Sequence, residues 1–124
     1  ATSWHEAHGR ARIEIAGRPR VAAHSVVEAY SVLTRLPGAS RVSPEVAAEF
    51  LGQVIHEKPL SLDAAHQMRL VSERFPVLGV AGGAVYDALI AETIRVAGGT
   101  LVTLDRRALA TYARLGCDAE LLAS

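Results

Sequence analysis

Residues 85–105 read VYDALIAETIRVAGGTLVTLD, and this stretch predicts a helix, a glycine turn and a strand in direct succession. The segment from Val85 to Ala97 is nearly all apolar, which indicates a buried helix, and Gly98–Gly99 ends it. Residues 100–104, TLVTL, are expected to form the clearest strand of the chain, because threonine and valine are β-branched and favour strands.

The same alternation of strands and helices extends outward from this stretch in both directions. Capping residues mark four helix starts: S-x-x-E boxes at 3–6 and at 25–28, Ser43 before Pro44, and Asp63. We expect, in chain order, a helix over about 3–16, a strand over 21–24, helices over 25–36 and 44–57, a strand over 58–62, a helix over 63–74, a glycine loop over 79–83, and, after Asp105, a helix and a last strand over 120–122. Strands that alternate with helices predict an α/β fold with a mainly parallel sheet.

Composition limits the class of protein. A length of 124 residues fits one domain, and an apolar fraction of 50% allows a real core. Thirteen basic and thirteen acidic residues give a formal net charge of zero, which excludes a strongly basic DNA-coating protein. Cys117 is the single cysteine, so no internal disulfide is expected and a cytoplasmic location is the simplest one. No run of about 20 apolar residues predicts a membrane span, and no signal peptide is visible.

Three acidic residues lie where a strand or loop passes into a predicted helix: Glu28, Asp87 and Asp105. Each has a purely structural explanation. Glu28 can complete a capping box, Asp87 can interact with a helix dipole, and Asp105 can be a simple N-cap.

Taken together, the three positions favour a shared site. Junctions of this kind gather along the carboxyl edge of a parallel sheet, where ligands usually bind. Asp87 also projects from a stripe formed by Ile90, Ala91 and Ile94, a poor setting for an unpartnered charge. Carboxylates that converge on one point repel one another unless a divalent cation holds them, and Mg²⁺ prefers oxygen ligands and bridges to phosphate. Such an ion can activate water for attack on a phosphodiester.

At this point the motifs resemble a known family. The segment VEAYSVLTRLP at 27–37 resembles the glutamate-bearing helix of PIN domains in VapC toxins. The segment GAVYDALIA at 83–91 resembles their next acidic helix, and LVTLDRR at 101–107 resembles the strand end that bears the last acidic residue. Residues 115–118 and 121–122 also match the end of the family, so the similarity covers essentially the whole chain.

The resemblance implies a PIN-like three-layer α/β/α domain with a mainly parallel sheet and a metal-dependent endoribonuclease activity. Glu28, Asp87 and Asp105 take the acidic positions, where they would hold Mg²⁺ or Mn²⁺ and activate water for RNA cleavage. The implied partners are RNA, a VapB-type antitoxin that neutralises the toxin, and a second copy of the chain in a homodimer.

The chain departs from the family pattern at its start. Family members begin with a mid-sheet strand that ends in an aspartate, whereas Ala1–Glu6 resembles the segment after that strand. We therefore expect residues 1–124 to form a single PIN domain that lacks its N-terminal strand and one of four acidic positions. This departure keeps an alternative open, a catalytically impaired PIN fold that binds RNA or an antitoxin. A response-regulator receiver fits less well, because Lys58 does not follow a late strand.

Several other residues receive weaker predictions. Arg106 and Arg107 follow Asp105 directly and can grip RNA phosphates or simply be solvated. Glu92 lies about 140° round the helix from Asp87 and is not expected to share its ligand. His5 and His8 are expected to be surface residues, and His24 to be structural.

Aromatic and large aliphatic residues receive two further predictions. Tyr30, Tyr86 and Tyr112 are expected in the core rather than as base-stacking surfaces. The helices at 25–36 and 44–57 are expected to form a groove for an apolar antitoxin helix, since Tyr30, Leu33, Phe50 and Leu51 exceed what a thin helix layer can bury.

Overall fold

The computed structural model describes residues 14–15 and 18–122. The strands of this part are β1 (Glu14–Ile15), β2 (Arg18–Pro19), β3 (Leu101–Thr103) and β4 (Ala119–Leu121). The α-helices are α2 (Ala23–Thr34), α3 (Pro44–Val54), α4 (Ala64–Arg69), α5 (Phe75–Leu78), α6 (Ala84–Val96) and α7 (Leu109–Arg114). Shorter helical turns are η1 (Gly38–Ser40), η2 (Leu70–Arg74) and η3 (Arg106–Ala108).

The parallel pairings place strand ends beside helix starts, as expected for an α/β fold. β3 and β4 pair in parallel, with Val102 opposite Glu120. A second parallel pairing is a single bridge between Ala22 and Leu60, made by hydrogen bonds from Leu60 N to Val21 O and from Ala23 N to Leu60 O. Within the described residues, no strand joins this bridge to β3.

The two strands predicted near residues 21 and 60 are therefore much shorter than expected. The predicted strand over 21–24 is wrong beyond Ala22, because α2 begins at Ala23 and takes His24 into the helix. The strand predicted over 58–62 pairs only at Leu60. Neither segment continues as a strand. The first passes into α2 at Ala23, and the second is followed by Asp63, the N-cap of α4.

The first predicted helix is wrong at its end. Glu14–Ile15 is a strand that pairs antiparallel with Arg18–Pro19, although a helix to about residue 16 was expected. Ile13 and Ile15 alternate with Arg12 and Glu14 in the sequence, and this period of two favours a strand over a helix. The remainder of the predicted helix lies outside the described residues.

The capping box predicted at Ser25 is also wrong. The N-cap of α2 is Ala22, which offers no side-chain cap, and no acidic residue lies in the first turn. Glu28 is therefore not a capping residue. By contrast, Ser43 Oγ accepts a hydrogen bond from Val46 N at the start of α3, and Asp63 Oδ1 accepts one from His66 N at 2.7 Å at the start of α4.

The helix after Asp63 runs further than predicted and changes its winding. α4 passes into the π-helical turn η2 and then into α5, which ends at Gly79 with φ of 71°. Pro76 explains part of this change, because its nitrogen cannot donate to the preceding helical turn. The left-handed conformation at Gly79 suits glycine and stops the helix.

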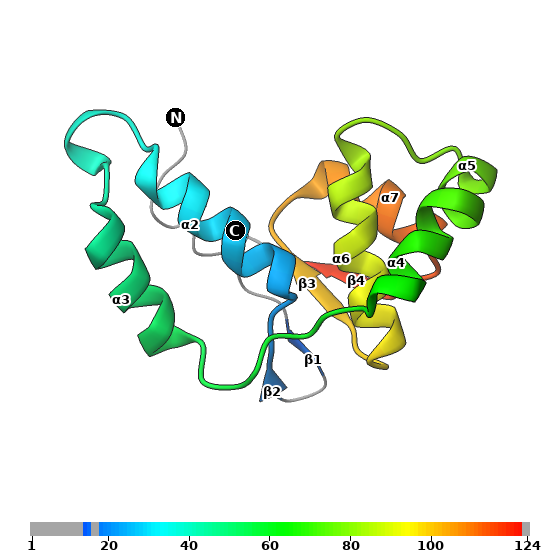
Figure 1. The fold of residues 1–124 in the computed structure, drawn as a ribbon, viewed down its shortest axis with the longest axis horizontal. Helices are drawn as coiled ribbons and strands as arrows, with labels where there is room; N and C mark the ends of the chain where they lie inside the picture. The colour runs from blue at the N-terminus through cyan, green and yellow to red at the C-terminus, as the bar shows by residue number, and fades with distance from the viewer. Residues whose placement is uncertain (1–13, 16–17, 123–124) are drawn as a thin grey trace.

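Figure 1 shows α2 and α3 side by side on one side of the molecule, α4 and α5 on the other, and α6 with β3 between them. The larger apolar core surrounds α6, β3 and α7, and its most buried members include Ile94, Leu101 and Leu115. A second cluster lies between α2 and α3 around Leu33 and Leu51.

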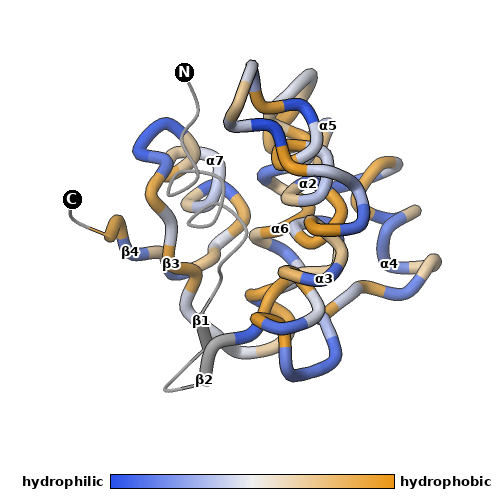
Figure 2. Tube along the Cα trace, turned by 90° about the vertical axis from the view of Figure 1, so that its left-hand side faces the viewer, coloured by the Kyte–Doolittle hydropathy of each residue, from blue (hydrophilic) through white to orange (hydrophobic). Residues whose placement is uncertain are grey.

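Figure 2 shows that the turn between β3 and α7 is hydrophilic, in contrast to the apolar strand before it. In the described part of the chain, no helix has the length and apolar character needed to cross a membrane.

Candidate active site

One pocket brings the three predicted acidic residues together. Glu28 from α2, Asp87 from α6 and Asp105 from the end of β3 all line it. The remaining lining residues are Ser25, Ile90, Leu101, Val102, Thr103 and Tyr112. Three segments far apart in the sequence therefore bring carboxylates to one opening, at the end of β3 where the strand passes toward a helix.

Asp87 and Glu28 reach the pocket from two helices that pack against each other. Asp87 lies in the first turn of α6 and is half-buried. Its neighbours Ala88, Ile90 and Ala91 are buried, so the helix must place this face against the protein. Glu28 is half-buried on α2, beyond the first turn.

Asp105 is held by its own backbone surroundings. Its Oδ1 accepts a hydrogen bond from Arg107 N at 3.0 Å, so the predicted N-cap is confirmed. Its backbone N–H donates to Thr103 Oγ1 at 3.0 Å. These two contacts fix the carboxylate at the pocket through one of its two oxygens. The structural role and the pocket position are therefore compatible.

Ser25 adds an unusual polar atom to the pocket. Its Oγ is buried and has no hydrogen-bond partner among the described residues. A buried hydroxyl without a partner costs on the order of 1–3 kcal/mol, and such groups commonly indicate a water or an ion.

The residues that line the pocket fit a hard divalent cation. The side-chain donor set consists of oxygens, from three carboxylates and three hydroxyls, and Mg²⁺ and Mn²⁺ prefer oxygen ligands. Within the described residues, however, no three His, Cys, Asp or Glu side chains lie close enough to hold one ion by themselves. An ion of this kind would therefore need waters to complete its coordination, and Mg²⁺ commonly retains several.

The two arginines after Asp105 are exposed, in the hydrophilic turn of Figure 2. The Arg107 side chain is 94% exposed, and its Nε lies 3.7 Å from Asp105 Oδ1. An ion pair this exposed stabilises the protein little. The guanidinium can therefore turn toward a phosphate without a large cost.

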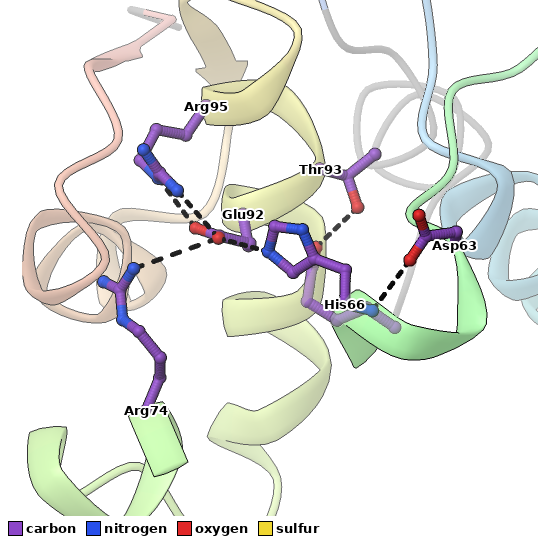
Figure 3. Close-up of polar contacts among 7 residues, drawn as sticks. Asp63, His66, Arg74, Glu92, Thr93 and Arg95 are labelled. Atoms are coloured by element: carbon purple, nitrogen blue, oxygen red, sulfur yellow. Dashed lines mark hydrogen bonds and ion pairs between the residues drawn. The ribbon is translucent and has the colours of Figure 1, made fainter. Parts of the chain in front are cut away.

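Glu92 lies outside the pocket, as predicted, and forms a separate buried ion cluster. The carboxylate is only 1% exposed. It accepts hydrogen bonds from Arg95 Nε at 2.7 Å and Nη2 at 2.8 Å, and it is 2.7 Å from His66 Nε2. Arg74 Nη1 is 3.9 Å away, so residues of α4, η2 and α6 meet at one carboxylate (Figure 3).

Electrostatics in this cluster strongly favour the ionised carboxylate. The hydrogen bonds from Arg95 lower the pKa of Glu92 from 4.5 to about 2, with help from His66 and Arg74 and against the effect of burial. The same hydrogen bonds raise the pKa of Arg95. The sequence carries one signal for this cluster, an i,i+3 Glu–Arg pair in an otherwise apolar helix. The contributions of His66 and Arg74 depend on tertiary packing.

The aromatic predictions are only partly correct. Tyr112 is buried, as expected, and lines the pocket. Tyr30 is 39% exposed and Tyr86 is 55% exposed, so the prediction that both lie in the core is wrong. His5 and His8 lie outside the described residues.

Comparison with known proteins gives consistent matches over most of the chain. The PIN domain family model matches residues 1–115. Ribonuclease VapC40 of Mycobacterium tuberculosis (strain ATCC 25618 / H37Rv) is 39% identical over 120 residues, which cover 97% of this chain and 89% of that protein. Ribonuclease VapC27 of the same strain is 38% identical over 96 residues, which cover 75% of this chain and 66% of that protein. No solved structure matches the chain significantly.

Proposed function

The chain belongs to the PIN-domain family, with relatives of the VapC type, and on that premise we propose that it is an endoribonuclease toxin whose activity requires a divalent metal ion. The observation that carries the proposal is the shared pocket of Glu28, Asp87 and Asp105. The relatives named ribonucleases support RNA as the substrate.

The three acidic residues would hold Mg²⁺ or Mn²⁺ with their carboxylates, directly or through bound water. When bound, the ion would lower the pKa of an attacking water and neutralise phosphate charge. The reaction is hydrolysis: the phosphorus gains a bond to the water oxygen, a P–O bond of the RNA backbone breaks, and the leaving oxygen takes a proton from the water and departs as a hydroxyl.

The residues of this chain would also orient the RNA. The cap contact from Arg107 N holds the Asp105 carboxylate in place, so that it need not reorganise during the reaction. The exposed guanidiniums of Arg106 and Arg107 would bind backbone phosphates next to the pocket, where bidentate contacts suit arginine.

A cleavage assay tests this proposal. The purified protein should cleave single-stranded RNA in Mg²⁺ or Mn²⁺, lose the activity in excess EDTA, and regain it when metal is added back. Full cleavage in excess EDTA would refute a metal-dependent mechanism.

A second candidate function is a PIN fold that binds RNA or an antitoxin without cleaving. The observation in its favour is that no three potential ligand side chains of the described residues are close enough to hold an ion. RNA binding without cleavage in any of Mg²⁺, Mn²⁺ and their mixture would favour this function over the first.

We also propose that a VapB-type antitoxin covers the exposed apolar face of α2 and α3. Of the four residues expected to line a groove there, Leu33 and Leu51 are buried between the two helices, whereas Tyr30 is exposed and Phe50 is half-buried. Other exposed apolar residues extend this face, namely Val27, Val46 and Val54. Such a face suits an amphipathic helix.

A matched pair of variants tests the antitoxin surface. Val46→Asp on α3 should lose co-purification with a VapB-type antitoxin, whereas Val71→Asp, a similarly exposed change on η2, should retain it. The opposite pattern would place the partner elsewhere. We expect the toxin itself to be a homodimer, which analytical ultracentrifugation of the free protein checks.

A further inference from the structure

Two aromatic rings stack beside the acidic pocket. The rings of His24 and Tyr86 have centroids 5.2 Å apart and an interplanar angle of 7°. His24 lies at the start of α2 and Tyr86 in the first turn of α6. The stack therefore connects the beginnings of the two helices that supply Glu28 and Asp87.

The stack adjoins the pocket without lining it. His24 directly precedes Ser25 and lies four residues before Glu28, which puts it on the same side of α2. Tyr86 directly precedes Asp87. Ser25, Glu28 and Asp87 line the pocket, whereas neither ring does.

Packing alone does not account for this arrangement. Tyr86 does not belong to either of the two apolar core clusters. Tyr86 remains 55% exposed although one face of its ring lies against His24. An aromatic side chain is thus more than half exposed next to residues that line the acidic pocket.

The acidic pocket creates a problem for RNA binding that such a surface solves. Three carboxylates repel the phosphates of an RNA backbone, so some of the binding energy must come from uncharged parts of the RNA. Nucleobases have uncharged π-faces that stack on aromatic side chains whatever their sequence. In a duplex both faces of each base are covered, so only unpaired bases are available.

We propose that the His24–Tyr86 stack is a platform for a nucleobase of single-stranded RNA, which it holds beside the acidic pocket. This inference rests on the proposed function and makes it more specific, because it names the two residues that would hold an unpaired base beside the acidic pocket. Tyr86 and His24 are positioning residues in this account.

Binding of a defined RNA to the complete protein tests the platform. The probe is a 12-nucleotide single-stranded RNA of mixed sequence with one 2-aminopurine, whose fluorescence is quenched by stacking, and binding is measured in EDTA. Tyr86→Leu should weaken binding about tenfold and lose the quenching. Tyr86→Phe keeps the ring and should bind within about twofold of the original protein. Val77→Ala, an exposed change on α5, is the control and should leave binding unchanged.

Three further readouts separate stacking from a structural effect. His24→Leu should weaken binding in the same direction as Tyr86→Leu, and both variants should melt within a few degrees of the original protein. The same RNA annealed to its complement should bind the original protein and Tyr86→Leu equally. In Mg²⁺, Tyr86→Leu should raise KM and leave kcat nearly unchanged, because the carboxylates are untouched.

Each result has a defined meaning. Equal affinity and equal quenching for Tyr86→Leu and the original protein would overturn the platform, and so would an equal loss in Tyr86→Phe, which would assign the effect to the hydroxyl. Should Tyr86→Leu fail to fold, His24→Leu and Tyr86→Phe decide the question by the same criteria. Failure of the original protein to cleave RNA in Mg²⁺ would refute the proposed function, and the ring-dependent binding would still be measured separately.

Discussion

Glu92 accepts two hydrogen bonds from the guanidinium of Arg95, at 2.7 and 2.8 Å. The two residues are three positions apart on α6, so their side chains are neighbours on the helix. The carboxylate is buried, whereas the Arg95 side chain is 39% exposed. His66 of α4 completes the contact at 2.7 Å. The cluster therefore joins α4 to α6, the helix that also carries Asp87 into the pocket.

The Glu92 cluster predicts a loss of stability in acid. The folded pKa of Glu92, about 2, lies below its ordinary value of 4.5. The stabilisation is therefore complete above about pH 5 and is lost as the pH falls through the interval from 4.5 to about 2. The shift corresponds to a contribution on the order of 3 kcal/mol at neutral pH. Urea unfolding at a series of pH values measures it.

Glu92→Gln separates this effect from the titration of other carboxylates. The variant keeps the side-chain volume and removes the titrating group. The difference in free energy of unfolding between the two proteins should be largest near pH 7 and should shrink toward pH 2. A difference that stays constant over this range would contradict the role assigned to the Glu92 charge.

Asp63 caps the helix that carries His66 to Glu92 (Figure 3). Asp63→Ala should destabilise the protein by about 1 kcal/mol, because His66 N loses its side-chain acceptor. Asp63→Asn retains an acceptor at the same position and should cost far less. Thermal or urea unfolding of both variants checks the expectation, and equal losses in the two would argue against a capping role.

Cys117 should be an unreactive thiol in the folded protein. Burial, assisted by the nearby charge of Asp118, raises its pKa from 9.0 to about 11. The thiolate fraction at pH 8 is then lower by roughly a hundredfold, and only the thiolate reacts with alkylating reagents. Iodoacetamide labelling should be slow in buffer and fast in concentrated urea. Equal rates in the two conditions would show that the thiol is accessible and ionises normally.

The helix and the strand near residue 90 were well predicted from sequence. The apolar run at 85–97 is too long for an ordinary strand, and the two glycines after it separate the helix from the next strand. α6 and β3 match the expected segments closely. Ser25 shows where such reasoning fails. Its S-x-x-E spacing is that of a capping box, yet the helix already begins at Ala23, directly after the backbone pairs with Leu60. A long-range pairing thus determined the helix start, and local sequence does not contain it.

The grouping of the three carboxylates was predicted better than the sheet around them. Junctions between strands and helices lie along one edge of a parallel sheet. Glu28, Asp87 and Asp105 could therefore be grouped from their positions in the sequence alone. The stacking of His24 on Tyr86 could not, because it depends on how α2 and α6 pack and on the side-chain conformations of both residues. The same applies to the contact of His66 with Glu92, which joins residues 26 positions apart.

A calorimetric titration with Mn²⁺ tests the central claim, that the three carboxylates form one metal-dependent hydrolytic site. The original protein should bind Mn²⁺ saturably, and Asp87→Asn should bind at least about tenfold more weakly because one negative charge leaves the ligand set. Asp118→Asn, an exposed change away from the pocket, should bind normally. RNA cleavage should fall in parallel with Mn²⁺ binding in these proteins. Undiminished Mn²⁺ binding together with undiminished cleavage in Asp87→Asn would contradict the account.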